Sequence, residues 1–390
     1  MTDAPVLSQR ALNRTLLERQ LLTRRTSQSA LQVIEHLVAM QGQEPNWPYI
    51  GLWTRLTDFR KEELNSLLQD RKVVRSTMLR RTVHLAVADD FRWLWPTVQP
   101  IVSSALKAAF YADEIEGLDL DELARVGREL LSGRTLTRQE FGRLLVERFP
   151  GRHGGRLAES VGIMVATVHG PATGAWGRWG NPPRVPVTLA EEWNGRPMAA
   201  SPEPETMIRR YLAAFGPATV MDIQAWSGLT RLREVVEGMR KQLRVLRDEE
   251  GRELFDLPGA PLADSGQPVP VRFLPAFDNA LLGHKDRSRV ISDADRKRFA
   301  KVASGGVPMF LVDGFVQGTW SVQGSTLLLA PFRPLTEAET AAVLEEADRL
   351  LAFIAPDAPD APERNIAFVD DETVPVNRLH AGQRIRNKAS

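Results

Sequence analysis

The feature that most restricts the fold is an element order that recurs along the chain: helices followed by a short β ribbon. Residues 8–23, 28–40 and 58–69 carry apolar side chains at helical spacing, and residues 73–87 read as two strands around a tight connection. This order of helices and then a β ribbon is that of a winged helix, a variant of the helix-turn-helix motif. The first part of the chain therefore predicts a winged helix.

The same order recurs twice more, without any exact repeat of the residues. Residues 120–132, 136–149 and 155–168 read as helices and precede a Trp- and Pro-rich segment, residues 173–189. Residues 204–215 and 217–240 read as a helix and a helix-turn-helix, and residues 243–257 as a hairpin. A Pro- and Gly-rich segment, residues 258–270, then leads to strand-like segments and a helix at 335–354.

We therefore predict an α+β protein of four domains. The first three are tandem winged helices that surround a DNA-binding channel, and the last is a β-rich α+β subdomain. The predicted boundaries are residues 1–105, 106–203, 204–260 and 261–390.

The composition excludes several kinds of chemistry. The chain has 390 residues and no cysteine, which rules out disulfides, thiol catalysis and Cys-ligated zinc. Its six histidines lack metal-site spacing and no phosphate-binding loop is present, so we expect neither a metal nor a cofactor. A net charge of +1 does not by itself indicate nucleic acid. Without a signal sequence or a long apolar run, we expect a cytoplasmic protein that does not enter membranes.

The segment MQGQEPNWPYIGLW contains two glutamines, Gln41 and Gln43, that flank Gly42. A glutamine amide neither gains nor loses a proton near neutral pH, so it is not a usual catalytic group. The segment is either a polar corner between helices or a site whose chemistry needs an uncharged polar group. Glu44 would be an alternative carboxylate, although strand alternation aims it away from Gln43.

Two other segments concentrate polar groups that are candidates for DNA contacts. The segment VVRSTMLRRTVHL places Arg80, Arg81 and His84 on or beside the first ribbon, and Arg55 lies on the helix after the glutamines. In the segment FLPAFDNALLGHKDRSRV the candidates are Asn279, His284 and Arg287. The alternatives are a solvated surface for the arginines and hydrogen-bonded structural roles for the histidines.

Four segments together resemble the bacterial winged-helix DNA glycosylases of the AlkZ/YcaQ type: MQGQEPNWPYIGLW, LRRTVHLAV, FLPAFDNALLGHKDRSRV and VDGFVQGTW. The resemblance covers residues 8–385, and the two glutamines resemble the AlkZ-like branch. It implies tandem winged helices around a cationic channel and excision of bulky N7-alkylguanine, including interstrand crosslinks. It also implies catalytic roles for Gln41 and Gln43. Gly42 departs from the aliphatic residue that is usual between the two.

We therefore expect a monofunctional DNA glycosylase, a monomer whose partner is double-stranded DNA carrying alkylated guanine. The resemblance also allows a role in self-resistance to a genotoxic natural product. Two alternatives remain: a non-catalytic winged-helix DNA-binding or regulatory protein, and a structural interaction module. The term monofunctional rests on chemistry, because a lyase needs an amine nucleophile and no lysine lies near the glutamines in the sequence.

Overall fold

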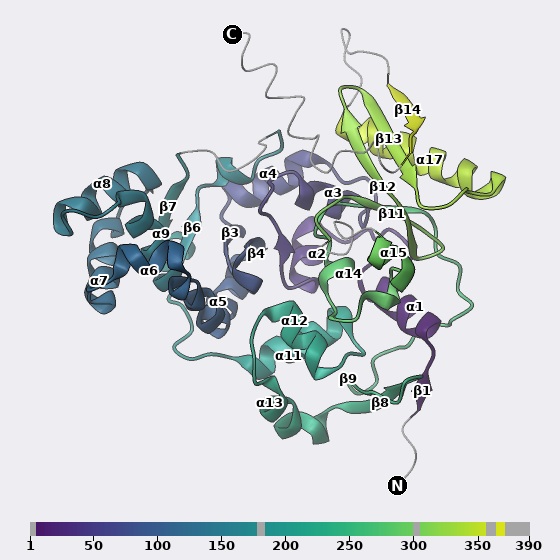
Figure 1. Cartoon of the computed structure of the whole chain (residues 1–390), viewed down its shortest axis with the longest axis horizontal. Coiled ribbons are helices and arrows are strands. Elements are labelled where there is room, and N and C mark those ends of the chain that lie inside the picture. The colour runs from purple at the N-terminus through teal and green to yellow at the C-terminus, as the bar shows by residue number, and fades with distance from the viewer. Residues whose placement is uncertain (1–4, 178–183, 299–304, 356–363, 371–390) are drawn as a thin grey trace.

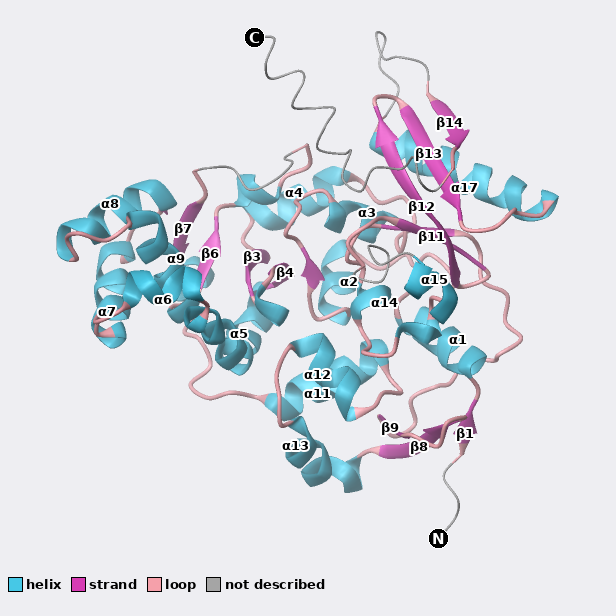
Figure 2. Cartoon of the chain, viewed as in Figure 1, coloured by secondary structure: helices cyan, strands magenta, loops and turns pink. Residues whose placement is uncertain are grey.

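The structure, a computed structural model, describes residues 5–177, 184–298, 305–355 and 364–370. Helices and small sheets alternate along the chain, which confirms the α+β class (Figures 1 and 2). The elements form successive groups of helices, each followed by a small sheet, and a larger sheet near the C-terminus.

The first group lies at the centre of the molecule (Figure 1). Its antiparallel sheet has the strand order β2-β4-β3. Ser29 caps α2 through a capping box with Gln32. Its elements are α1 (Gln9–Arg19), α2 (Ala30–His36), β2 (Met40–Gln41), α3 (Trp47–Trp53), α4 (Lys61–Gln69), β3 (Val73–Thr77) and β4 (Val83–Val87).

The second group forms a lobe at the left of Figure 1, with a sheet of order β5-β7-β6. The helix predicted to reach residue 168 ends earlier, because Thr167–His169 pairs with β7 as a strand. Before and within this lobe lie α5 (Ala88–Ser103), α6 (Ala109–Ile115), α7 (Leu120–Leu131), β5 (Leu136–Thr137), α8 (Arg138–Arg148), α9 (Gly154–Met164), β6 (Thr167–His169), β7 (Pro186–Leu189) and α10 (Ala190–Asn194).

The third group follows the predicted order closely, and its sheet has the order β1-β8-β9. Its turn between helices depends on Gly228, whose φ of +85° belongs to the left-handed region that favours glycine. The strand β1 (Val6–Leu7) joins this sheet from the N-terminal end of the chain. The other elements are α11 (Pro204–Phe215), α12 (Val220–Ser227), α13 (Leu232–Met239), β8 (Arg244–Asp248) and β9 (Glu253–Asp256).

The C-terminal part is built on a five-stranded sheet of order β10-β11-β12-β13-β14, at the upper right of Figure 1. Thr336 caps α17 through a capping box with Glu339, within the helix predicted at 335–354. The elements are β10 (Arg272–Leu274), α14 (Asn279–Leu282), α15 (Asp293–Arg298), β11 (Met309–Val312), β12 (Phe315–Gln323), β13 (Thr326–Pro331), α17 (Glu337–Ile354) and β14 (Asn365–Phe368).

The apolar cores connect groups that are distant in the sequence. One cluster joins Leu16, Val98, Tyr211 and Leu311, and so spans the first, third and C-terminal groups. A second cluster packs the first group against the C-terminal sheet. The second lobe has a core of its own between α7, α8 and α9. The division into four domains remains a prediction, but these shared cores hold the first, third and C-terminal groups together.

Candidate active site

Gln41 lies at the end of β2, where the edge strand pairs with β4. The antiparallel register places Gln41 opposite His84 and Met40 opposite Leu85. The strand ends at Gln41, so Gln43 lies outside it and does not follow its alternation. The two glutamines consequently line different spaces.

A narrow cleft of about 10 Å³ lies beside Gln41, between α3 and the start of α14. Asp278 and Asn279 contribute to its wall, which Gln41, Arg55 and Pro275 complete. This volume corresponds to about one water molecule. The side-chain oxygen of Gln41, Oε1, is buried and has no hydrogen-bond partner among the described residues. Because a buried acceptor without a partner is costly, this oxygen needs a donor, and a water in the cleft would supply it.

Behind this cleft, Arg55 forms a fully buried ion pair with Asp278. The distances are 2.8 Å from Arg55 Nη1 to Asp278 Oδ2 and 2.8 Å from Nη2 to Oδ1. Arg55 also donates to the backbone oxygens of Gln20 and Gly51. Asp278 caps α14 by accepting from Ala280 N–H. The guanidinium of Arg55 is therefore buried and occupied, and it holds α3 against α14. The predicted DNA contact of Arg55 stays a prediction, although this guanidinium is not exposed to a DNA phosphate.

A second buried arginine, Arg75 on β3, fixes the backbone of the glutamine loop. Its Nε donates to the carbonyl of Gly42 at 2.9 Å and its Nη2 donates to the carbonyl of Gln43 at 3.2 Å. Its Nη1 lies 3.1 Å from Nδ1 of His169 on β6. Burial first, and then the charge of Arg138, lower the pKa of Arg75 to about 10, so it stays charged near neutral pH. Arg75 thus ties the loop of the first group to the second lobe.

Gly42 is not required by the shape of this loop. Its φ is not in the left-handed region, and its N–H donates to the carbonyl of Val83 at 2.8 Å. A Cβ built on it would lie 3.4 Å from Leu85 Cγ, an ordinary van der Waals distance. The loop therefore accommodates a residue with a Cβ at this position.

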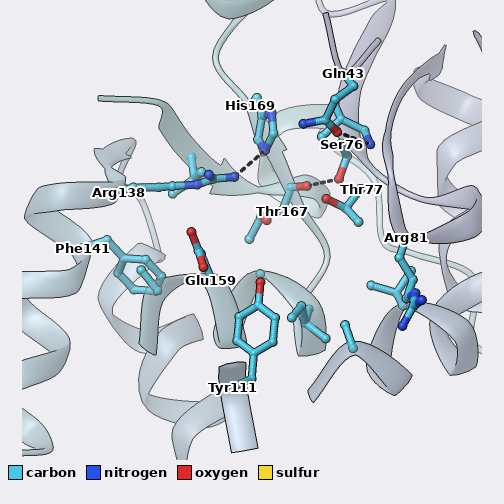
Figure 3. Close-up of a pocket in the computed structure, with 17 residues that line it drawn as sticks. Gln43, Ser76, Thr77, Arg81, Tyr111, Arg138, Phe141, Glu159, Thr167 and His169 are labelled. Atoms are coloured by element: carbon cyan, nitrogen blue, oxygen red, sulfur yellow. Dashed lines mark hydrogen bonds between the residues drawn. The ribbon is translucent and has the colours of Figure 1, made fainter. Parts of the chain in front are cut away.

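Gln43 lines a larger cavity of about 210 Å³, named here the Gln43 cavity, between β3–β4 and α6, α8, α9 and β6 (Figure 3). The side-chain oxygen of Gln43 accepts from Val83 N–H at 3.2 Å. The exposed Arg81, with φ of +63°, lies on the same wall of the cavity. The cavity is lined by Gln43, Ser76, Thr77, Arg81, Val83, Val102, Ala105, Tyr111, Arg138, Phe141, Ala158, Glu159, Gly162, Ile163, Thr167, His169 and Val187.

Two arginines, Arg80 and Arg287, lie near His84, the residue that pairs with Gln41. Arg80 Nη1 donates to the carbonyl of Trp226 at 2.5 Å, and its Nη2 lies 3.4 Å from His84 Nε2. His84 Nδ1 lies 2.8 Å from the carbonyl oxygen of Thr82, which an N–H on Nδ1 satisfies. Burial, and then Arg80, lower the pKa of His84 to about 3, so its ring is neutral.

The charge of Arg287 acts on the pKa of Arg80. Burial, and then the charge of Arg287, lower the pKa of Arg80 to about 10. Arg287 is half-buried, and its Nη1 is buried without a partner among the described residues. Two neighbouring guanidinium groups with an unused donor are suited to an anion such as a DNA phosphate.

The other two residues predicted for DNA contact are buried. Asn279 donates through Nδ2 to the carbonyl of Ala39 at 2.8 Å, which holds the start of α14 to the strand before Gln41. His284 is buried beside Tyr211, and the backbone of Phe215 lies close enough to its ring to influence its pKa. Burial, and then Arg289, lower the pKa of His284 to about 3. Neither side chain is accessible to a DNA phosphate in this structure.

Other polar groups near the glutamines have different surroundings. Glu44 lines neither the Gln41 cleft nor the Gln43 cavity, and its charge acts on Arg75. No lysine lines either space among the described residues. Burial lowers the pKa of Lys61 to about 8, but its Nζ lies 4.1 Å from the ring centre of Trp176 and donates to the carbonyl of Ile354. The aromatic residues around the loop pack the interior, since Trp47 meets the edge of Trp320.

Two kinds of site are not found in the described part of the chain. No group of three or more His, Asp or Glu side chains there is arranged to hold a metal ion. No helix there is both long and apolar enough to cross a membrane.

Small helix-and-sheet groups surround Gln41 and Gln43, and buried arginines hold their loop in place, which defines a candidate active site. The chain belongs to the AlkZ-like DNA glycosylase family, whose model, "DNA glycosylase AlkZ-like", matches residues 34–353. A Streptomyces sahachiroi protein named "Interstrand DNA cross-link repair glycosylase" is 27% identical over 352 residues, which cover 85% of this chain and 92% of that protein. The solved structure of Streptomyces sahachiroi DNA glycosylase AlkZ has a similar fold, with a TM-score of 0.75 at 24% identity over 93% of this chain and 100% of that chain.

Proposed function

We propose that this protein is a monofunctional DNA glycosylase that hydrolyses the N-glycosidic bond of bulky N7-alkylguanine, including guanines joined in interstrand crosslinks. The observation that carries the proposal is the buried, unpartnered Oε1 of Gln41 beside a cleft of about 10 Å³. That oxygen is placed to accept a hydrogen bond from one water and to hold it. The name of the crosslink-repair relative supports the same substrate class.

The chemistry explains why a glutamine is sufficient. An N7-alkylguanine already carries a positive charge, so it departs without a general acid. The sugar becomes an oxocarbenium-like cation, as in glycoside hydrolysis. The protein must then place a water near C1′ and stabilise positive charge, and an amide oxygen does both through its lone pairs and its dipole. The same reasoning predicts little activity on unmodified bases, whose departure would need protonation.

The predicted roles of the two glutamines separate. Gln41 faces the water-sized cleft, whereas the oxygen of Gln43 is already bonded to Val83 N–H and its side chain lines the larger cavity. We assign the water to Gln41 and a lesion-side contact to Gln43. Hydrolysis rather than lyase chemistry fits a site in which no lysine lines either space among the described residues.

DNA would reach this site through a channel framed by the three helix-and-sheet groups, acting as winged helices. The exposed Arg81 and the cationic group of Arg80 and Arg287 are the proposed phosphate contacts, because their donors are not all used within the protein. A monomer in the cytoplasm would suffice for this activity. Self-resistance to a DNA-alkylating natural product is the biological role that this substrate class suggests.

The test is base release from duplex DNA. Wild-type protein, and a variant with both Gln41→Ala and Gln43→Ala, are incubated with duplexes carrying N7-methylguanine or a crosslinked guanine, and free base is quantified by mass spectrometry. We expect release by the wild type, none above background by the variant, and no strand cleavage until alkali is added.

Two results would contradict the proposal. Equal release by the wild type and the double variant would remove the glutamines from the chemistry. Salt-sensitive duplex binding without release of any base would identify a non-catalytic DNA-binding protein instead.

A further inference from the structure

Gln43, which lines the cavity, lies two residues after Gln41, the residue proposed to hold the water. The cavity lies between the first group and the second lobe (Figure 3). Its volume of about 210 Å³ is far larger than one catalytic water requires. It is about twenty times the volume of the Gln41 cleft, which corresponds to one water, so it can take a ring-sized organic group. The cavity therefore has room for a part of the substrate.

The lining contains apolar side chains from several elements. They are Val102 on α5, Ala105 just after it, Phe141 on α8, Ile163 on α9 and Val187 on β7. Phe141 and Val187 also belong to the buried core of the second lobe, so this surface is held rigidly. These apolar side chains share the lining with polar ones such as Ser76, Arg81 and Arg138, so the cavity offers both kinds of surface to an organic group.

Several of the polar groups inside the cavity already have partners. The carboxylate of Glu159 lies 3.1 Å from Arg156 Nη1, and a hydrogen bond between Glu159 and Tyr111 contributes to the raised pKa of Tyr111, after burial and the charge of Glu159. His169 Nε2 lies 3.2 Å from Arg138 Nη2. Burial, and then Arg75, lower the pKa of His169 well below its usual range, so the ring is neutral.

The chemistry of the substrate indicates which part would enter. In guanine, N7 and the sugar-bearing N9 belong to the same five-membered ring, so a substituent on N7 begins close to the bond that breaks. N7 also lies on the major-groove edge of the base, from which its substituent projects. With the reacting bond near Gln41, that substituent is the portion of the lesion nearest to Gln43.

We propose that the Gln43 cavity binds the group attached to N7 of the alkylated guanine, and that it selects a ring-sized group over a methyl group. This inference rests on the proposed function, because it names the lesion class of the same site. Selection here would let the protein distinguish bulky adducts from N7-methylguanine, whose methyl group is too small to fill the cavity.

Gly162 offers a way to fill the cavity without crowding the protein. It lies on α9 and lines the cavity, and a Cβ built on it meets only Thr167 Oγ1, at 3.6 Å. Gly162→Leu therefore extends a side chain into the open space. Gly238 on α13 is the matched control, since a Cβ there meets nothing within 4 Å. Both substitutions replace a helical glycine, so each is expected to favour its helix.

Binding separates this inference from catalysis. The ligands are duplexes with 7-deazaguanine carrying either methyl or benzyl at the ring position of N7; these bases are uncharged and resist departure. We expect wild-type protein to bind the benzyl duplex about tenfold more tightly than the methyl duplex, from burial of the ring. Gly162→Leu should abolish this preference while binding the methyl duplex normally, and Gly238→Leu should retain it.

The inference is overturned if the wild type shows no preference, or if Gly162→Leu keeps it. It is also overturned if Gly162→Leu weakens both duplexes equally, because the cavity would then hold the base itself. Base release from N7-alkylguanine duplexes is measured beside these affinities. A preference that depends on Gly162, without any base release, would support the cavity assignment and contradict the proposed glycosylase activity.

Discussion

Removing the carboxylate of Asp278 should strongly destabilise the protein. Asp278 and Arg55 make two contacts of 2.8 Å, and their side chains are 2% and 0% exposed. Asp278→Ala would leave the guanidinium buried and uncompensated, which costs about 3–5 kcal/mol of unfolding free energy. Arg55→Met with Asp278→Leu removes both charges, so we expect a smaller loss than the sum of the two single substitutions.

Denaturant unfolding followed by tryptophan fluorescence measures this loss, since Trp47 and Trp53 on α3 lie beside Arg55 in the core. Glu122→Ala is the control, because it breaks the exposed ion pair with Arg125 and should leave the midpoint unchanged. If Asp278→Ala lowers the free energy of unfolding by less than about 1 kcal/mol, the guanidinium of Arg55 is not left uncompensated and the reasoning is refuted.

Three further outcomes follow from local geometry. Burial lowers the pKa of His84 to about 3, so as the pH falls the unfolded chain takes up this proton before the folded protein does. The contribution of His84 to the free energy of unfolding is therefore present above about pH 6.5 and falls by about 2 kcal/mol at pH 5. Denaturant midpoints measured at both pH values should drop less in His84→Gln than in the wild type. Gly228→Ala forces a Cβ to 3.2 Å from the Arg80 backbone at φ +85°, and should lower the melting temperature more than Gly251→Ala, which meets nothing within 4 Å. Gly42→Ala should leave base release within about twofold of the wild type, since its Cβ makes ordinary contacts.

Local signals in the sequence were sufficient for many elements. The turn glycine Gly228 and the cap Thr336 each mark a boundary that the structure contains. No helix or strand was predicted in residues 88–119. The structure has the 16-residue helix α5 there, with Pro96 and Pro100 inside it. Prolines at those positions remove two helical N–H donors, so the pattern argued against a helix that tertiary packing nevertheless stabilises.

Only part of the site could be predicted, because the glutamines form a local motif whereas the residues that pack around them come from distant parts of the chain. The glutamine segment was visible locally, but the burial of Arg55 depends on Asp278, which lies 223 residues away. The separate surroundings of Gln41 and Gln43 also escaped a local reading. Strand alternation would place two such residues on one face, whereas β2 ends at Gln41.

The most direct test of the proposed mechanism is the single-turnover release of N7-methylguanine by Gln41→Ala. If Gln41 holds the attacking water, the rate constant should fall by about 10²-fold, as expected when a reacting group is displaced by about 1 Å. Affinity for the same duplex and the unfolding midpoint should remain at the wild-type values. A Gln41→Ala protein that releases the base within about threefold of the wild-type rate would contradict the assignment of the water to Gln41.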